Sequence, residues 1–197
     1  MIEFDALFRE SVEASLALKR RVLESQLGPI RRAAGLLLEA YRGDRKALFF
    51  GNGGSAADAQ HLAAEMEGRY GFDRRPLPAL ALHANVSTLT AIANDYGYEQ
   101  VFARTLEAHA RAGDVAIALS TSGTSRNVVA AARLKQRLGI TLVALTGENG
   151  AALAPFADVV IAVPSRNTAR IQETHILVGH ILCDYVERSL FGSRDEP

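Results

Sequence analysis

Residues 49–67 read FFGNGGSAADAQHLAAEME, an apolar run that leads through a glycine-rich turn into a sequence with helical character. Lys46 to Phe50 is predicted as a buried strand, and the turn Gly51-Asn52-Gly53-Gly54 requires backbone conformations that glycine adopts at little cost. Ser55 is predicted to cap the following helix, with Asp58 three residues later. Such a turn leaves backbone N–H groups unpaired at the positive end of a helix, which favours an anion or a sugar oxygen. We therefore expect the ligand site to begin here.

Two side chains on this predicted helix, His61 and Glu65, are four residues apart and therefore share one face. A pair at this spacing is also common as a solvent-exposed polar contact without a further role. Because this pair follows a glycine turn directly, we interpret it as part of a functional site.

A second polar turn follows the apolar run Val115–Leu119, which is typical of a central parallel strand. The turn reads STSGTS at residues 120–125, and the helix predicted after it extends to about Leu138. Its backbone N–H groups and hydroxyls could surround a phosphate without a fixed positive side chain. The alternative interpretation is a capped helix start that binds no ligand.

The composition narrows the classes of protein that the chain can belong to. Lysine plus arginine and aspartate plus glutamate number 22 each, so no overall basic field indicates nucleic-acid binding, and we expect none. The single cysteine excludes an intramolecular disulfide and favours a reducing compartment, which makes the cytoplasm the expected location. No run approaches the ~18 apolar residues of a membrane span, so we expect no membrane segment.

The first 43 residues predict a helical layer ahead of the first strand. Apolar residues at every fourth position favour a helix from about Ile2 to Gln26. We expect Gly28-Pro29 to break this helix and Pro29 to stand in the first turn of a second one. In a small α/β protein such a layer often makes subunit contacts.

The core, residues 44–191, alternates short apolar strands with helices. Further strands are expected at Ala79–Leu82, Thr141–Leu145 and Asp158–Val163, and further helices after Ser87, at Glu99–Ala112 and from Thr168 to about Leu190. The predicted inward stripe of the last helix is Ile171, His175, Val178, Leu182 and Tyr185. We therefore predict one α/β domain over residues 1–197, a three-layer, doubly wound, flavodoxin-like sheet of five parallel strands. Both polar turns lie at the carboxyl ends of strands, where such sheets bind ligands.

Four ordered blocks resemble the sugar isomerase (SIS) domain and, within it, the sedoheptulose 7-phosphate isomerases, also called phosphoheptose isomerases. The blocks extend from Gly51 to Glu187 and read GNGGSAADAQHLAAE, AIANDYGYEQVFAR, GDVAIALSTSGTS and TARIQETHILVGHILCDYVE. The resemblance implies a homotetramer whose active sites draw on more than one subunit. It also implies isomerisation of sedoheptulose 7-phosphate to D-glycero-D-manno-heptose 7-phosphate through an enediolate, the first step of bacterial ADP-heptose synthesis for the lipopolysaccharide core.

The resemblance also assigns roles to particular side chains. It implies that Glu65 and His180 are the acid/base pair. The substrate-binding residues that it implies are Asn52, Gly53, Gly54, Ser55, Glu65, Asn94, Asp95, Ser120, Thr121, Ser122, Ser125 and Gln172. The ligands that it implies for one zinc ion per subunit are His61, Glu65, Gln172 and His180. Thr124, where asparagine is expected, and His83-Ala84-Asn85 depart from the family pattern in ways that concern substrate preference.

Two of these zinc ligands, Gln172 and His180, are eight residues apart, which corresponds to roughly 12 Å of helix rise. One metal ion reaches both only if their long side chains converge, if the helix is irregular between them, or if a neighbouring subunit supplies one ligand.

The alternative function is a non-catalytic SIS-domain protein, either an adaptor that binds the replication initiator DnaA or a sensor of sugar phosphates. Such relatives need not keep the acid/base pair. Glu65 and His180 are both present in this chain, which favours the enzyme.

Overall fold

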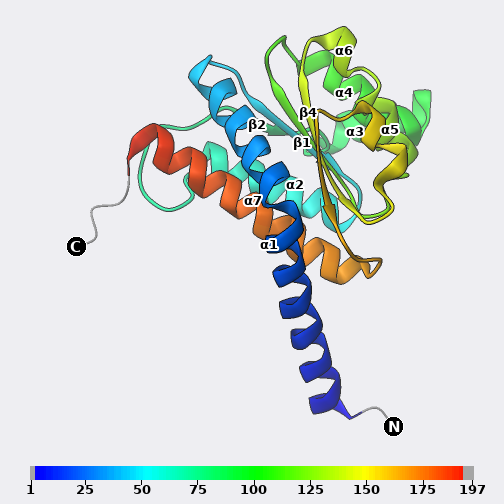
Figure 1. Ribbon diagram of the computed structural model, residues 1–197. Coiled ribbons are helices and arrows are strands. Elements are labelled where there is room, and N and C mark those ends of the chain that lie inside the picture. The colour runs from blue at the N-terminus through cyan, green and yellow to red at the C-terminus, as the bar shows by residue number, and fades with distance from the viewer. Residues whose placement is uncertain (1–2, 193–197) are drawn as a thin grey trace.

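A parallel sheet of five strands forms the centre of the protein in the computed structural model, which describes residues 3–192 (Figure 1). The strands are β1 (Ala47–Gly51), β2 (Ala79–Ala81), β3 (Val115–Ser120), β4 (Thr141–Gly147) and β5 (Val159–Val163). Their spatial order is β2-β1-β3-β4-β5, so the direction of winding reverses between β1 and β3. Gly51 pairs with Leu119 in the register of these two strands, which places their carboxyl ends side by side. The predicted doubly wound sheet is confirmed, and its switch point lies between the two polar turns.

Helices cover both faces of the sheet (Figure 1). One face packs against α1 (Phe4–Arg42), α2 (Gly54–Glu67) and α7 (Thr168–Phe191), and the other against α3 (Val86–Tyr96), α4 (Val101–His109), α5 (Arg126–Ala132) and α6 (Lys135–Leu138). Three short 3₁₀ segments complete the elements: η1 (Tyr98–Gln100), η2 (Gly150–Ala152) and η3 (Ala154–Phe156). Because side chains alternate along each strand, Phe49 contributes to the first core and Phe50 to the second. Burial on both faces explains why the strands read as continuous apolar runs.

The N-terminal layer is one helix rather than the two that we predicted. α1 runs without interruption from Phe4 to Arg42 with Pro29 inside it. Contacts on both sides of the proline hold the helix against the sheet: Gln26 Oε1 accepts a hydrogen bond from Ala162 N at 3.0 Å, and Arg32 Nη2 donates one to Asp158 O at 2.7 Å. These long-range contacts offset the single helical hydrogen bond that proline removes. The first half of α1 extends away from the body of the protein (Figure 1).

Two of the predicted helix caps were wrong. α2 begins at Gly54, and its N-cap is Gly53 with φ 56°, so Ser55 lies inside the first turn and is buried. α3 is capped by Asn85, whose side chain accepts a hydrogen bond from Thr88 N, and not by Ser87. In both cases the structure places the cap two residues earlier than the serine.

Three further predictions about helices need correction. The helix expected after the second turn ends at Ala132, and a separate short helix, α6, follows it. The helix expected at Glu99–Ala112 is η1 followed by α4, which ends at His109. Tyr185, assigned to the inward stripe of α7, is 46% exposed, and the fully buried Val186 takes the inward position.

Within residues 3–192, no helix combines the length and the apolar character that crossing a membrane requires.

A buried carboxylate on α7 holds the segment that leaves α2. Glu187 is 1% exposed, and its side chain accepts backbone hydrogen bonds from Tyr70 and Gly71 at 2.9 Å and from Phe72 at 3.2 Å. The guanidinium of Arg74 lies 3.7 Å away and donates to the carbonyl oxygens of α2, including that of Glu65 at 2.8 Å. A carboxylate that accepts several N–H groups is well suited to a site from which water is excluded.

We predict that Glu187→Gln destabilises the protein by about 2–4 kcal/mol, because the amide removes the charge and directs a donor at a cluster of N–H donors. Urea unfolding monitored by circular dichroism measures the change as a lower midpoint with an unchanged slope. Glu107→Gln, whose partner Arg137 is an exposed residue, is the matched control and should lose less than about 1 kcal/mol. Equal unfolding free energies for the two variants would contradict the role assigned to Glu187.

A buried histidine of α7, His175, makes the stability of the protein sensitive to acid. Its side chain is fully buried, and one ring nitrogen contacts Thr146 O at 3.1 Å. Burial lowers the pKa of His175 to about 4, although the contact with the Thr146 carbonyl opposes this shift. The unfolded chain therefore binds a proton at this residue below its ordinary pKa of 6.5, while the folded chain does not until about pH 4.

We predict that the unfolding free energy falls as the pH is lowered from 6.5 to 4, with His175 contributing on the order of 3 kcal/mol. In His175→Gln this contribution to the pH dependence disappears, whatever the variant's stability at pH 7. Unfolding curves at a series of pH values measure the difference, and His109→Gln, at an exposed position, is the control. An identical pH slope in wild type and His175→Gln would contradict the prediction.

Candidate active site

The carboxyl ends of β1 and β3 are joined by two asparagines. Asn52 Nδ2 donates to Asn127 Oδ1, and Asn127 Nδ2 donates to Asn52 Oδ1, both at 2.8 Å. The hydroxyl of Tyr98 donates to Asn52 Oδ1 at 3.1 Å. The two strand ends predicted to form one site therefore meet. Sequence reasoning missed Asn127, since nothing in the local pattern separates it from any other polar residue in a first helical turn.

A cavity of about 450 Å³ opens beside this asparagine pair, a volume typical of sites for small molecules. The lining residues are Asn52, Tyr98, Glu99, Ser125, Arg126 and Asn127. They come from the end of β1, from η1 and from the turn into α5, so three segments that are distant in the sequence face one space.

Hydroxyls of the second turn point toward one another at the end of β3. Ser120 Oγ and Ser125 Oγ are 3.2 Å apart, and Gly123 N donates to Ser120 Oγ at 3.2 Å. Ser122 Oγ accepts from both the backbone and the side chain of Thr124, at 3.2 and 3.0 Å. Ser120 is nearly buried, whereas Ser122 and Thr124 are exposed. The predicted cradle therefore has a fixed inner hydroxyl and exposed outer ones.

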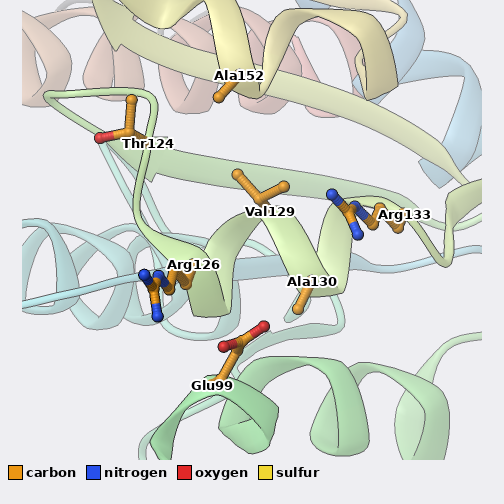
Figure 2. A pocket seen from close by; sticks show the side chains of 7 residues that line it. All are labelled: Glu99, Thr124, Arg126, Val129, Ala130, Arg133 and Ala152. Carbon is orange, nitrogen blue, oxygen red and sulfur yellow. The ribbon is translucent and has the colours of Figure 1, made fainter.

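A smaller hollow of about 160 Å³ adjoins the cradle at Thr124 (Figure 2). Its lining residues are Glu99, Thr124, Arg126, Val129, Ala130, Arg133 and Ala152. Arg126 and Glu99 line both hollows, and in Figure 2 Glu99 lies below α5 while Arg126 stands at its start. We expected a phosphate cradle without a fixed positive side chain, and Arg126, the exposed residue directly after the turn, lines both hollows.

The predicted acid/base residues are linked through His61 along the contact of α2 with α7. His180 Nε2 lies 3.0 Å from His61 Nε2, which in turn lies 3.2 Å from Glu65 Oε1. The carboxylate and the two imidazoles thus form one chain of polar contacts, with His61 in the middle. The ring of Tyr70 lies 5.7 Å from that of His180, centroid to centroid. The structure therefore joins side chains that are more than a hundred residues apart in the sequence.

The cluster lies on the same face of α2 as the glycine turn, because Gly54, His61 and Glu65 are separated by seven and four residues. Asp58 lies one turn before His61. Burial raises the pKa of the Asp58 carboxyl, and the charge of His61 partly opposes this shift. Sequence reasoning gave Asp58 only a role near the helix cap.

The donors of this cluster are of the kinds that zinc accepts, two imidazole nitrogens and a carboxylate oxygen. Their separations of 3.0 and 3.2 Å approach the roughly 3.3 Å between neighbouring ligands of a tetrahedral zinc ion. In the arrangement observed, however, the donors contact one another, and no group of three or more His, Cys, Asp or Glu side chains within residues 3–192 is placed so that it could hold a metal ion. The chemistry of the donors fits zinc, and the side chains would have to separate around it.

Gln172, the fourth predicted zinc ligand, lies away from these three. Its amide packs on Gly54 so closely that a Cβ at position 54 would come within 2.5 Å of Nε2. α7 is a regular helix through both Gln172 and His180, so an irregular helix does not bring them together. Within one chain, Gln172 belongs beside the glycine turn, which suits its predicted contact with the substrate.

The remaining predicted substrate residues, Asn94 and Asp95, are exposed at the end of α3. Asn94 Nδ2 donates to Asp95 Oδ1 at 2.8 Å. Tyr98, three residues after Asp95, is the side chain of this region that contacts Asn52.

Comparisons with known proteins place the chain in a family. The model of the SIS domain matches residues 10–147. The phosphoheptose isomerase of Sulfurimonas denitrificans is 50% identical over 93% of this chain and 95% of its own length. The solved structure of the Neisseria gonorrhoeae phosphoheptose isomerase has a TM-score of 0.88 at 41% identity, covering 94% of this chain and 99% of that one. That of the Francisella tularensis enzyme has a TM-score of 0.91 at 34% identity, covering 95% and 100%. The chain therefore belongs to the phosphoheptose isomerases of the SIS-domain family.

Proposed function

We propose that this protein interconverts sedoheptulose 7-phosphate and D-glycero-D-manno-heptose 7-phosphate. The observation that carries the proposal is the contact of His180 on α7 with His61, and through it with Glu65, on the helix that begins at the glycine turn. Membership of the phosphoheptose isomerases supports the same substrate. A sensor or adaptor has no need of an imidazole brought 3.0 Å from another beside a carboxylate.

The reaction moves a carbonyl between C2 and C1 of the sugar. Glu65 acts as the base that takes a proton from C1 of the ketose, which leaves an enediolate, and returns that proton to C2. His180 moves the accompanying proton between the oxygens on C1 and C2, since an imidazole can donate through one nitrogen and accept through the other. His61 contacts both partners, so the Glu65 carboxylate and the His180 imidazole are both oriented toward His61.

Substrate binding is assigned to the two strand ends. The hydroxyls of Ser120, Ser122 and Ser125 and the N–H groups of their turn bind the phosphate, with the Arg126 guanidinium next to it. Asn52 and Gln172 lie on the glycine turn side and bind the hydroxyls of the sugar chain.

We include one zinc ion per subunit in this proposal, with His61, Glu65 and His180 as its ligands. Bound there, zinc would polarise the carbonyl oxygen and stabilise negative charge on the enediolate oxygens. A carboxylate bound to a metal is a weaker proton acceptor, so the roles of zinc ligand and general base compete at Glu65.

The proposal extends to assembly, location and pathway. Apolar side chains on α1 and α7 are exposed, among them Phe4 at 75%, Phe8 at 61% and Ile181 at 47%. Exposed apolar stripes on helices mark surfaces that bind other chains, which supports the contacts between subunits that the proposed homotetramer needs. A reaction on a free sugar phosphate suits the cytoplasm and the first step of ADP-heptose synthesis for the lipopolysaccharide core.

We predict that Glu65→Gln lowers kcat/KM for sedoheptulose 7-phosphate by at least about 100-fold, because the amide cannot accept the proton from C1. Appearance of the aldose product, followed by chromatography, measures the rate. Glu67→Gln, at an exposed position on the same helix, is the matched control and should keep the wild-type rate. Turnover at the wild-type rate in Glu65→Gln would remove Glu65 from this role.

We predict that protein purified without chelators carries about one zinc ion per chain, and that His61→Ala loses it because a central nitrogen donor is gone. Mass spectrometric metal analysis measures the content without any need for activity. His109→Ala, which removes an exposed histidine, should keep the wild-type content. Full zinc occupancy in His61→Ala would exclude a zinc site formed by His61, Glu65 and His180.

A further inference from the structure

At the switch point, the side-chain amides of Asn52 and Asn127 each donate one hydrogen bond to the other and accept one from it. Asn127 is 4% exposed, and its Oδ1 accepts a second hydrogen bond from Val128 N at 2.9 Å. Asn52 Oδ1 accepts from Tyr98 as well as from Asn127. The two amides therefore fix each other's orientation, and the Val128 contact fixes the first turn of α5 in the same network.

The asparagine pair lies between the two polar turns of the candidate site and links them. Asn52 belongs to the glycine turn after β1, and Asn127 follows the serine-rich turn after β3. These turns supply the two halves of the proposed sugar phosphate site. The pair is thus a direct side-chain link between the halves, 75 residues apart in the chain and beside the 450 Å³ cavity.

We propose that Asn127 is a positioning residue for the sugar phosphate. It acts through Asn52: by holding that amide and the start of α5 in one arrangement, it sets the distance between the sugar-binding turn and the phosphate-binding turn. Its own polar atoms face Asn52 and Val128, so it orders the site without being a catalytic residue. The inference rests on the proposed function for the identity of the ligand, but the link itself does not depend on turnover.

The chemistry of the pair requires an amide at position 127. An ionised aspartate of nearly the same shape accepts hydrogen bonds but donates none, so its second oxygen would face Asn52 Oδ1. It would also place a negative charge beside a site for a phosphate dianion. Alanine removes the link and adds no charge. The two substitutions therefore separate loss of the link from electrostatic repulsion.

The experiment measures binding and turnover separately in wild type, Asn127→Ala, Asn127→Asp and Asn52→Ala, and in the double variant Asn52→Ala/Asn127→Ala. Inorganic phosphate binding by calorimetry reports the phosphate turn whether or not the protein turns over the heptose. KM and kcat with sedoheptulose 7-phosphate report the whole site. Gln136→Ala, which removes an exposed amide on α6, is the control for loss of an amide elsewhere.

We expect Asn127→Ala to raise KM and the phosphate dissociation constant by about tenfold, with kcat changed by less than about threefold. Asn127→Asp should raise KM and the phosphate dissociation constant further. The KM of the double variant should equal that of Asn52→Ala, because Asn127 acts through Asn52.

Wild-type KM and phosphate affinity in a folded Asn127→Ala, or multiplicative losses in the double variant, would overturn the proposal. Failure of both Asn127 variants to fold would also overturn it, since the pair would then serve the fold alone. If the wild type itself binds phosphate and is inactive on the heptose, the proposed function fails while the phosphate measurements still test the link.

Discussion

The site depends on how closely α7 approaches α2. Gly179 faces Leu62 of α2 at a distance where a Cβ would lie 2.5 Å from the leucine Cδ2, so only glycine permits this contact. The residues next to these two in the sequence are His180 and His61, whose imidazoles meet at 3.0 Å. A larger residue at position 179 would force either the Leu62 side chain or α7 to move, directly beside the two imidazoles. The polar cluster is therefore a consequence of apolar packing directly beside it.

The same pair of helices is held at two further points along its length. Near the start of α2, Gly54 lets the Gln172 amide pack on its Cα. Beyond its end, the Glu187 carboxylate accepts the N–H groups of the segment that contains Tyr70, while Arg74 binds carbonyls of the last turn of α2. The contacts run in the same order on both helices, which shows that α2 and α7 lie parallel. Glu65 and His180 thus sit between two fixed points, and neither depends on a flexible loop for its position.

Local patterns were sufficient to predict the strands of the sheet and the two polar turns, because each strand is an apolar run and β1 and β3 end in glycine or hydroxyl residues. They failed where distant contacts decide the structure. The continuity of α1 through Pro29 depends on Gln26 and Arg32 binding β5 and its preceding turn, more than 120 residues away. Asn127 could not be singled out for the same reason, because its partner Asn52 follows the neighbouring strand, 75 residues away in the chain. The grouping of His180 with His61 and Glu65 was expected from a family resemblance, whereas helical spacing alone indicated only the pair on α2.

Two histidines five residues apart on α7 show how packing assigns different chemistry to one residue type. His175 faces the sheet, where burial lowers its pKa to about 4 and keeps the ring neutral over most of the pH range in which proteins function. His180 lies on the flank of the helix, half-buried and in contact with His61 and Tyr70. A turn and a half of helix rotates one imidazole into the core and the next toward α2. The identity of the residue does not distinguish the buried histidine from the one that contacts His61; the surface that α7 presents at each position does.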